Sequence, residues 1–195
     1  MSMGLQDIDS SSWAQLEVAG SSPNSAFRYV NFCSVDAQNR PQARMVVLRC
    51  ADKLARTLEF HTDARSPKWL EISANPNVTI LGYCHQTRLQ LRLTGTVELH
   101  APESQVAEKA WSKLSPHTQN TYAAGPPGYE LAFDAADKNA EPAPSVTADG
   151  KANFGVLIVK VSTLDWYQLE RENNQRALLT YTDSGICASS QWINP

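Results

Sequence analysis

The alternation of apolar and polar residues between Arg88 and Leu99 constrains this chain more than any other pattern in it. One parity is apolar and would form a buried face: Leu89, Leu91, Leu93, Val97 and Leu99. A period of two residues is typical of a β-strand with one face against a core. Gly95 breaks the alternation and predicts a bulge or a bend, as a curling sheet needs. The segment therefore predicts a long strand in a curved sheet.

Other segments extend this prediction to most of the chain. Further strands are expected at 27–34, 43–50, 57–62, 78–84, 154–169, 176–182 and 189–193. Short helices are expected at 12–19, 66–73, 102–114 and from Pro116. Successive strands with short connections favour an antiparallel meander that closes into a barrel. The helices are too few and too late in the chain for a doubly wound parallel sheet.

The size and punctuation of the chain bound its organisation. A chain of 195 residues is most simply a single domain, 1–195. Residues 123–153 carry four prolines and few large apolar side chains. That composition predicts a long, partly mobile loop that is able to cover a site.

Charge and composition exclude several classes of function. A formal net charge of −3 gives no basic field for nucleic acid or for an anionic membrane. The apolar runs are much shorter than a membrane span, and the first residues lack the features of a signal peptide. The four cysteines form no C-x-x-C pair, and the four histidines have no H-x-x-x-H spacing. We therefore expect a cytoplasmic protein without a metal site, and the role of the cysteines stays open.

The segment Arg65-Ser66-Pro67-Lys68 joins an expected strand to an expected helix. Ser66 is placed to be the N-cap of the helix, and Pro67 its first residue. Cations at a helix N-terminus oppose the helix dipole, and free backbone N–H groups point to the same place. The segment predicts an anion site, with phosphate as the natural candidate, although a solvated turn with incidental basic residues would have the same sequence.

Three other groups are candidates for binding. Arg44 and Arg49 end an apolar strand, and their separation sends them to opposite faces. One arginine could hold a phosphate through its bidentate fork, or both could be ordinary charged strand ends. Gln90 could recognise an amide-like ring edge or simply face solvent. Trp166 and Arg176 flank a polar hairpin tip, where a tryptophan is usually core and an arginine usually surface.

In order and spacing, these segments resemble the pyridoxamine 5′-phosphate oxidase family and its relatives, the flavin-binding split barrels. The resemblance covers about 27–195 and rests on 44–49, 60–68, 89–95, Trp166 with Arg176, and 192–195. It implies a mainly β fold with flanking helices, built as a six-stranded antiparallel split β-barrel. It also implies a homodimer that binds FMN at the subunit interface and acts on a small molecule.

The same resemblance implies roles for individual residues. Arg44 and Lys68 would hold the FMN phosphate, and the strand after Arg44 would pass along the isoalloxazine ring. His61 would lie near the ring and is the candidate for proton transfer. Trp166 and Arg176 of the partner subunit would complete the pocket. The residues expected to bind the cofactor are Arg44, Met45, Val46, Val47, Leu48, Arg49, His61, Thr62, Arg65, Ser66, Lys68, Gln90, Trp166 and Arg176.

The departures from the family concern the substrate. Family oxidases hold pyridoxine phosphate with a lysine at the position of Arg49, and with a tyrosine, an arginine and a serine on a later helix. The nearest residues on that helix here are Trp111, Ser115 and Gln119. Where the oxidases have Arg-x-His, this chain has Glu172-Asn173-Asn174, and a carboxylate there repels a phosphate.

The sequence therefore predicts an FMN-dependent oxidoreductase whose substrate and electron donor it does not identify. The form of residues 65–68 resembles the uncharacterised branch of the family more than the true oxidases. Two alternatives stay open. One is a pyridoxamine or pyridoxine 5′-phosphate oxidase with an altered substrate pocket, and the other is a flavin-binding module without turnover.

Overall fold

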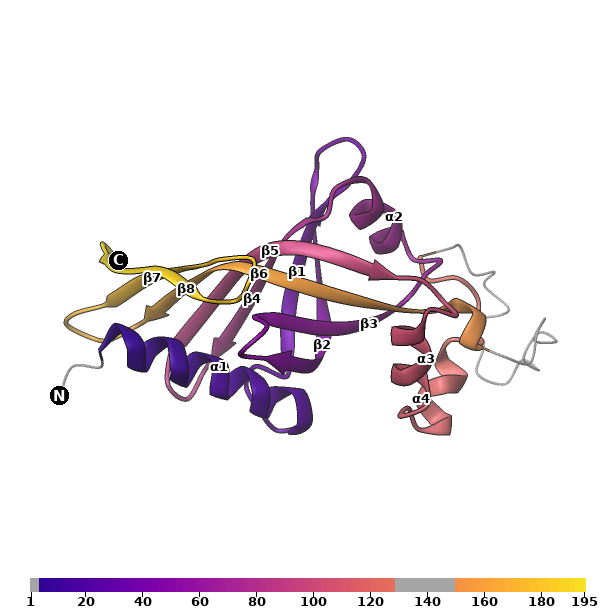
Figure 1. Ribbon diagram of the computed structural model, residues 1–195, viewed down its shortest axis with the longest axis horizontal. Helices are drawn as coiled ribbons and strands as arrows, with labels where there is room; N and C mark the ends of the chain where they lie inside the picture. The colour runs from indigo at the N-terminus through magenta and orange to yellow at the C-terminus, as the bar shows by residue number, and fades with distance from the viewer. Residues whose placement is uncertain (1–3, 129–149) are drawn as a thin grey trace.

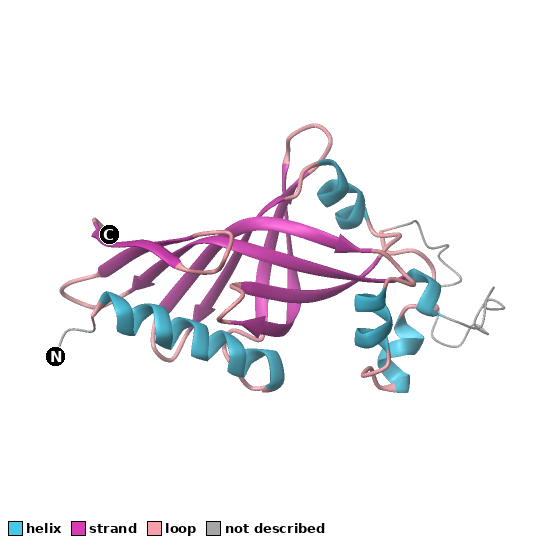
Figure 2. Cartoon of the chain, in the orientation of Figure 1, coloured by secondary structure: helices cyan, strands magenta, loops and turns pink. Residues whose placement is uncertain are grey.

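The computed structural model describes residues 4–128 and 150–195 and is built around one sheet that curls into a barrel (Figure 1). The strands are β1 (Tyr29–Val35), β2 (Pro41–Asp52), β3 (Thr57–Asp63), β4 (Asn77–Cys84), β5 (Leu89–His100), β6 (Phe154–Gln168), β7 (Gln175–Tyr181) and β8 (Cys187–Ile193). The helices are α1 (Leu5–Ser21), α2 (Pro67–Ala74), α3 (Gln105–Trp111), α4 (Pro116–Thr121) and the 3-10 turn η2 (Gly150–Asn153). The helices lie around the sheet (Figure 2).

Six strands close the barrel. Their spatial order is β3-β2-β1-β4-β5-β6, and β6 pairs with β3 to complete the ring. Every pairing is antiparallel. The 15 residues of β6 pair with β3 over 154–160 and with β7 over 163–168, so β7 and β8 extend the sheet beyond the barrel. The expected fold, mainly β with flanking helices and a six-stranded antiparallel barrel, is confirmed.

One connection departs from the expected meander. β4 pairs with β1 and not with β3, and α2 lies in the connection from β3 to β4. The reason is closure, because the second edge of β3 must pair with β6 to leave the ring without an exposed edge. The bulge expected at Gly95 is confirmed by a register shift between Thr94 and Gly95.

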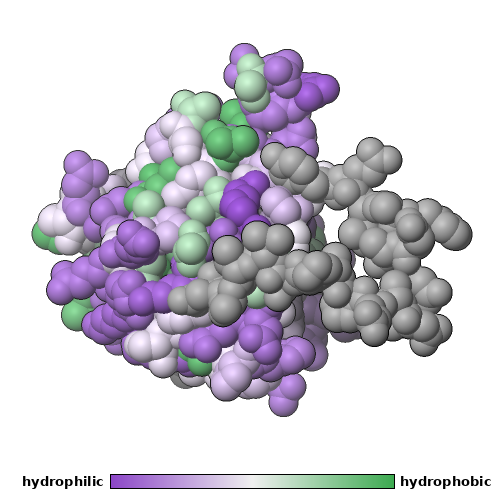
Figure 3. Space-filling model, turned by 90° about the vertical axis from the view of Figure 1, so that its right-hand side faces the viewer, coloured by the Kyte–Doolittle hydropathy of each residue, from purple (hydrophilic) through white to green (hydrophobic). Residues whose placement is uncertain are grey.

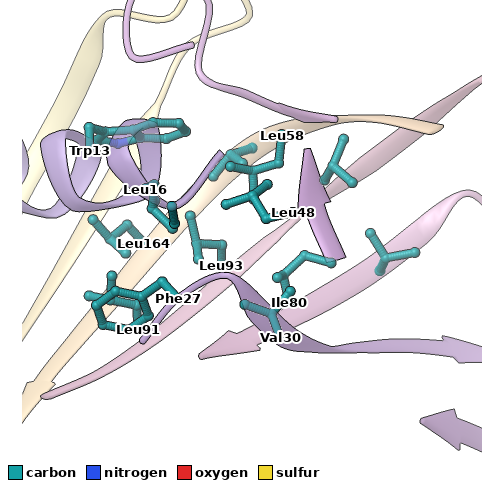
Figure 4. Packing of buried hydrophobic residues seen from close by; sticks show 14 of the residues in the cluster. Trp13, Leu16, Phe27, Val30, Leu48, Leu58, Ile80, Leu91, Leu93 and Leu164 are labelled. Atoms are coloured by element: carbon teal, nitrogen blue, oxygen red, sulfur yellow. The ribbon is translucent and has the colours of Figure 1, made fainter. Parts of the chain in front are cut away.

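The hydrophobic core fills the space between the barrel strands and α1. Trp13 and Leu16 of α1 are 0 % and 1 % exposed and lie over Leu58 and Leu164 (Figure 4). α1 begins seven residues before the helix expected at 12–19, because Ile8 extends its buried stripe by another turn. Asp9 and the three serines between Ile8 and Trp13 have weak helix propensity, and packing against the sheet outweighs it.

The second half of the chain has short helices. α3 is shorter than the helix expected at 102–114, and it starts where the Ser104 hydroxyl accepts the N–H of Ala107. α4 starts in the same way, with the Ser115 hydroxyl accepting the N–H of Thr118. Of the loop expected at 123–153, residues 129–149 lie outside the described residues. Among the described helices, none is long and apolar enough to cross a membrane.

Candidate functional site

The N-terminus of α2 follows directly on β3 and buries two hydroxyl groups. Thr62 and Ser66 are 4 % and 7 % exposed, and their side-chain oxygens lie 3.4 Å apart. Ser66 is the N-cap residue and Pro67 the first helical residue, as the sequence predicts. The Ser66 hydroxyl accepts no N–H from the helix, however. The first turn of α2 thus keeps backbone donors that its cap does not use.

Arg44 reaches this helix from β2. Its Nη2 donates to Glu71 Oε2 at 2.7 Å, and its Nη1 donates to Ser34 Oγ at 2.5 Å. The Ser34 hydroxyl donates in turn to the same Glu71 oxygen at 2.6 Å. The Glu71 side chain is 10 % exposed. The arginine expected to hold a phosphate is therefore paired with a nearly buried carboxylate.

Lys68 is one helical turn before Glu71 on α2. Burial and the positive charge of Arg44 lower the pKa of Lys68 to about 8, although Glu71 and Asp63 act in the opposite direction. Within residues 4–128 and 150–195, no hydrogen bond or ion pair to its amine is found. Lys68 is thus a half-buried cation whose charge an incoming anion would stabilise.

Arg65 pairs with the carboxylate of Asp63 at the end of β3. Its Nε and Nη2 donate to the two carboxylate oxygens of Asp63 at 3.0 and 2.7 Å. Nη2 also donates to the carbonyl oxygens of Tyr122 and Ala124. The Asp63 hydrogen bond is the main reason that the pKa of Arg65 is raised. In this arrangement Arg65 fastens the segment after α4 to the start of α2.

Arg49 and His61 occupy the faces of β2 and β3 opposite to those of Arg44 and Thr62, as strand alternation requires. The β2–β3 register shifts between Leu48 and Cys50, so Arg49 sits in a bulge. Arg49 and His61 both line a cavity of about 560 Å³ beneath α3.

Of the described residues that line this cavity, four are cationic (Arg28, Arg49, Lys109 and Lys113) and one, Glu59, is acidic, and two buried nitrogens there are unused. Among the described residues, Arg49 Nε and His61 Nδ1 are buried without a hydrogen-bond partner. The His61 side chain is 7 % exposed, and its Nε2 lies 2.9 Å from Glu59 Oε1. That hydrogen bond is the main cause that lowers the pKa of Glu59. Lys109 and Lys113 add two amines, so the lining favours an anion.

A second polar group lies on the outer face of β5, β6 and β7. Asp165 accepts from Arg92 at 2.5 Å and from Arg176 at 2.9 and 2.7 Å. Burial alone would raise the pKa of Asp165, but the hydrogen bonds and charges of the two arginines outweigh it and lower that pKa. Tyr167 lies next to Arg176 in the ladder and opposite Gln90 on β5. These residues form a polar strip on one sheet face.

Trp166 points to the other face of β6. It is 4 % exposed and belongs to the core, and its ring meets Trp192 edge-on at a centroid distance of 6.2 Å. Trp192 is 47 % exposed and lines a hollow of about 300 Å³ with Arg176. Arg176 and Trp192 thus border one hollow from neighbouring strands, and Trp166 packs edge-on against the Trp192 ring.

Large apolar side chains are exposed on the outer face of the barrel. Tyr29, Met45 and Tyr83 are 57 %, 59 % and 45 % exposed, on β1, β2 and β4. The strands are neighbours in the sheet, so the three residues lie on one continuous face. Figure 3 shows one end of the molecule, where hydrophobic residues also reach the surface between hydrophilic ones. An exposed face of this kind is typical of a contact with another protein chain.

The structure gathers the expected site residues into separate groups. Arg44, Thr62, Ser66 and Lys68 lie around the start of α2, and Arg49 and His61 lie around the cavity beneath α3. The backbone of β2 from Met45 to Leu48 runs between these two groups. Gln90, Trp166 and Arg176 lie toward the β7 end of the sheet, away from α2 (Figure 1).

Sequence reasoning missed three kinds of partner. Glu71 gave a signal, since it is three residues after Lys68 and so shares its helix face. Lys109 and Lys113 gave a similar signal as basic residues four apart in the expected helix at 102–114, although α3 ends at Trp111 and Lys113 follows it. Asp165 gave none, because its contact with Arg92 depends on the β5–β6 register.

The chain is similar to known proteins in sequence and in fold. A family model described as the FMN-binding domain of pyridoxamine 5′-phosphate oxidase matches residues 10–101. A pyridoxine/pyridoxamine 5′-phosphate oxidase 2 of Arabidopsis thaliana is 25 % identical over 94 % of this chain and 96 % of its own length. A pyridoxine/pyridoxamine 5′-phosphate oxidase of Caulobacter vibrioides is 36 % identical over 83 residues, 43 % of this chain and 36 % of the relative.

A solved structure agrees with these matches. A pyridoxamine 5′-phosphate oxidase-related, FMN-binding protein of Nostoc punctiforme superposes with a TM-score of 0.73 at 26 % sequence identity. The superposition covers 95 % of this chain and 96 % of the other. The fold is therefore the split barrel of these proteins, and FMN is the cofactor of the matched domain.

Proposed function

We propose, from its similarity to the pyridoxamine 5′-phosphate oxidase-related, FMN-binding proteins, that this chain is an FMN-dependent oxidoreductase that acts as a homodimer on a small anionic molecule. FMN supplies the electron chemistry when bound, and the protein binds and orients it. The observation that carries the proposal is the pair of cationic sites on the two sides of β2, with Lys68 at one and the unused Arg49 Nε at the other.

The start of α2 fits the phosphate of FMN. Lys68 is a half-buried amine without a partner among the described residues, and a phosphate would restore its pKa toward the ordinary value. Thr62 and Ser66 add hydroxyl groups, and the first turn of α2 adds backbone donors. The chemistry of this donor set is that of an anion site. Arg44 is a second cation at this site, and its Nη2 is paired with Glu71.

The expected contribution of a second subunit is supported by distance within the chain. Gln90 and Arg176 lie toward the β7 end of the sheet, away from α2 (Figure 1). We propose that a second copy, packed through the exposed face of β1, β2 and β4 across a twofold axis, brings its Arg176 to the α2 site. We assign the apolar face of Tyr29, Met45 and Tyr83 to this contact.

The cavity beneath α3 is our candidate for the substrate pocket. It begins at the end of the β2 segment that would line the flavin, and its volume of about 560 Å³ suits a small molecule. Arg49 Nε and His61 Nδ1 are two buried groups that a substrate could engage. His61 is the candidate for moving a proton, because Glu59 fixes its ring through Nε2.

A second candidate function is the oxidation of pyridoxine or pyridoxamine 5′-phosphate by a rebuilt pocket. Arg49, Lys109 and Lys113 would take over the contacts that other family members make with different residues. Turnover of pyridoxine 5′-phosphate, with pyridoxine inactive, would support this candidate. Absence of peroxide and aldehyde from either compound would remove it.

The test of the proposed function begins with the cofactor. Protein purified from cells should be yellow, and R44A/K68A should be colourless while it keeps its circular dichroism. Arg40, an exposed turn residue paired with Asp36, provides the control variant R40A. Full flavin content in the double variant would refute the phosphate assignment.

The catalytic part of the proposal needs a separate measurement. Anaerobic mixing of the holoprotein with NADH, NADPH or another candidate electron donor should bleach the flavin at a rate that rises with donor concentration. Reoxidation by a small anionic acceptor should then restore the colour. A tightly bound flavin that no such donor reduces would favour the non-catalytic module.

A further inference from the structure

Glu71 is a charged group in the α2 site that the proposed function leaves without a role. The sequence draws three cations to this site, but Asp63 neutralises Arg65 and Glu71 neutralises Arg44. Lys68 alone of the three has no ion pair among the described residues. A phosphate dianion that binds Arg44 would therefore meet the nearly buried carboxylate of Glu71, which is already paired with that arginine.

We propose that Glu71 is an internal competitor of the FMN phosphate, so that cofactor loading exchanges one anion for another on the guanidinium of Arg44. This inference rests on the phosphate site proposed above. In the structure, Arg44 Nη2 donates to Glu71 Oε2 at 2.7 Å. Carboxylate and phosphate oxygens make the same charge-assisted hydrogen bonds with a guanidinium, so both anions suit the same donors.

The contacts of Arg44 indicate that Glu71 competes for this arginine and is not needed to hold it in place. Arg44 does not depend on Glu71 for its position, because Nη1 donates to Ser34 Oγ at 2.5 Å and to the Phe32 carbonyl oxygen at 3.4 Å. Both of these partners belong to β1, the strand next to Arg44 in the sheet. Departure of the carboxylate would leave Arg44 held by β1, with Nη2 free for a phosphate oxygen.

The Ser34 hydroxyl can donate a hydrogen bond to either of the two competing anions. It accepts from Arg44 and donates to Glu71 Oε2 at 2.6 Å. Since a hydroxyl can turn its proton toward any nearby acceptor, the same donor can serve a phosphate oxygen after the exchange. Ser34 is 4 % exposed, so an unsatisfied donor there would be costly, and one of the two anions is needed at all times.

Competition predicts a specific change in affinity. Glu71→Gln keeps the size and an acceptor oxygen of the side chain but removes its charge. A unit charge a few ångströms from the phosphate in a partly solvated site changes affinity on the order of tenfold, so E71Q should bind FMN about tenfold more tightly. Riboflavin carries no phosphate, and its affinity should stay unchanged.

The experiment is a titration of the apoprotein with FMN and with riboflavin, in which the quenching of flavin fluorescence reports binding. The control variant is E108Q, which removes a carboxylate from the Lys151 ion pair on α3. The expected result is a rise of about tenfold in the ratio of riboflavin Kd to FMN Kd for E71Q alone. Carboxyl carbon NMR of Glu71 in the unsubstituted protein provides a second measurement, with a shift expected on FMN but not on riboflavin.

The outcomes distinguish this inference from the function on which it rests. If the unsubstituted protein binds neither flavin, the cofactor site itself is wrong. If it binds FMN and E71Q binds FMN equally or more weakly, Glu71 supports or ignores the site, and only the competition is overturned. Equal gains for both flavins, or a Glu71 signal that FMN leaves unmoved, would overturn it as well.

Discussion

Asp9 and Arg56 form a bidentate ion pair, with Nη2–Oδ2 and Nη1–Oδ1 distances of 2.6 and 3.1 Å, that ties α1 to the turn between β2 and β3. The Tyr181 hydroxyl donates to the same Asp9 carboxylate at 2.6 Å and accepts from Trp13 Nε1 at 3.0 Å. The Arg56 guanidinium also lies over the Tyr181 ring, 4.5 Å from its centroid. One network therefore joins α1, the β2–β3 turn and β7.

Tyr181→Phe tests how much this network contributes to stability. The substitution leaves the buried indole N–H of Trp13 without its acceptor, so we expect a loss of about 1–3 kcal/mol in the free energy of unfolding. Urea unfolding followed by fluorescence measures it. In a W13F background the donor is already absent, so the same substitution should cost less. Equal costs in both backgrounds would show that the two residues act independently.

Lys68 predicts a pH dependence for FMN binding. The pKa of Lys68 lies at about 8 in the folded apoprotein, so the amine is charged below that pH and loses its proton above it. FMN affinity should therefore fall as the pH rises from about 8 to 9.5. K68R keeps its charge throughout this range and should show no such fall. The measurement is the Kd for FMN across pH 7 to 10, with riboflavin as the phosphate-free control.

The same group has a defined effect on the stability of the apoprotein. Its folded-state pKa of about 8 lies below the ordinary value of 10.5, so between these pH values the unfolded chain binds more protons than the folded one. The contribution of Lys68 to the free energy of unfolding should then rise with pH across this window. K68R should remove that rise. A wild-type curve that falls in this window while that of K68R is flat would contradict the assigned pKa.

The barrel could be predicted from sequence because its signals are local. The alternation from Leu89 to Leu99 specifies one face of β5, and Gly95 specifies the bulge, each within a few residues. The start of α2 was equally readable, because Pro67 and its neighbours carry the positional preferences of a helix N-terminus. The pairing of β4 with β1 was not, since it depends on which strand edge must close the ring.

The electrostatic partners were harder to predict than the cations themselves. The sequence makes Arg65 a candidate phosphate ligand. In the structure, its Nε and Nη2 both donate to the carboxylate of Asp63, two residues earlier. Arg176 is similar, since its contact with Asp165 requires β6 and β7 to be in register. A basic residue can be recognised from sequence, but the pairing of its charge depends on where the chain places the nearest carboxylate.

Met45→Glu tests the proposed homodimer. Met45 is 59 % exposed on the apolar face that we assign to the subunit contact, and a buried, unpaired charge there would oppose association. We expect M45E to be monomeric by light scattering and to lose FMN, because Arg176 of the partner subunit could no longer complete the pocket. Leu54, 78 % exposed in the β2–β3 turn, provides the control L54E. Full FMN occupancy in a monomeric protein would exclude an interface site.

Gly95→Ala tests the bulge that shapes the barrel. A Cβ at residue 95 would lie 2.1 Å from the Lys160 carbonyl oxygen and 3.0 Å from the Val161 Cα, both of which belong to the neighbouring strand β6. Because these are backbone atoms, relief requires the β5–β6 ladder to move, and we expect G95A to cost about 3 kcal/mol in the free energy of unfolding. Gly125 has open space at the same position and provides the control G125A, expected to stay within about 0.5 kcal/mol. Urea unfolding of both variants measures the difference, and equal stabilities would mean that the bulge is soft enough to admit a methyl group.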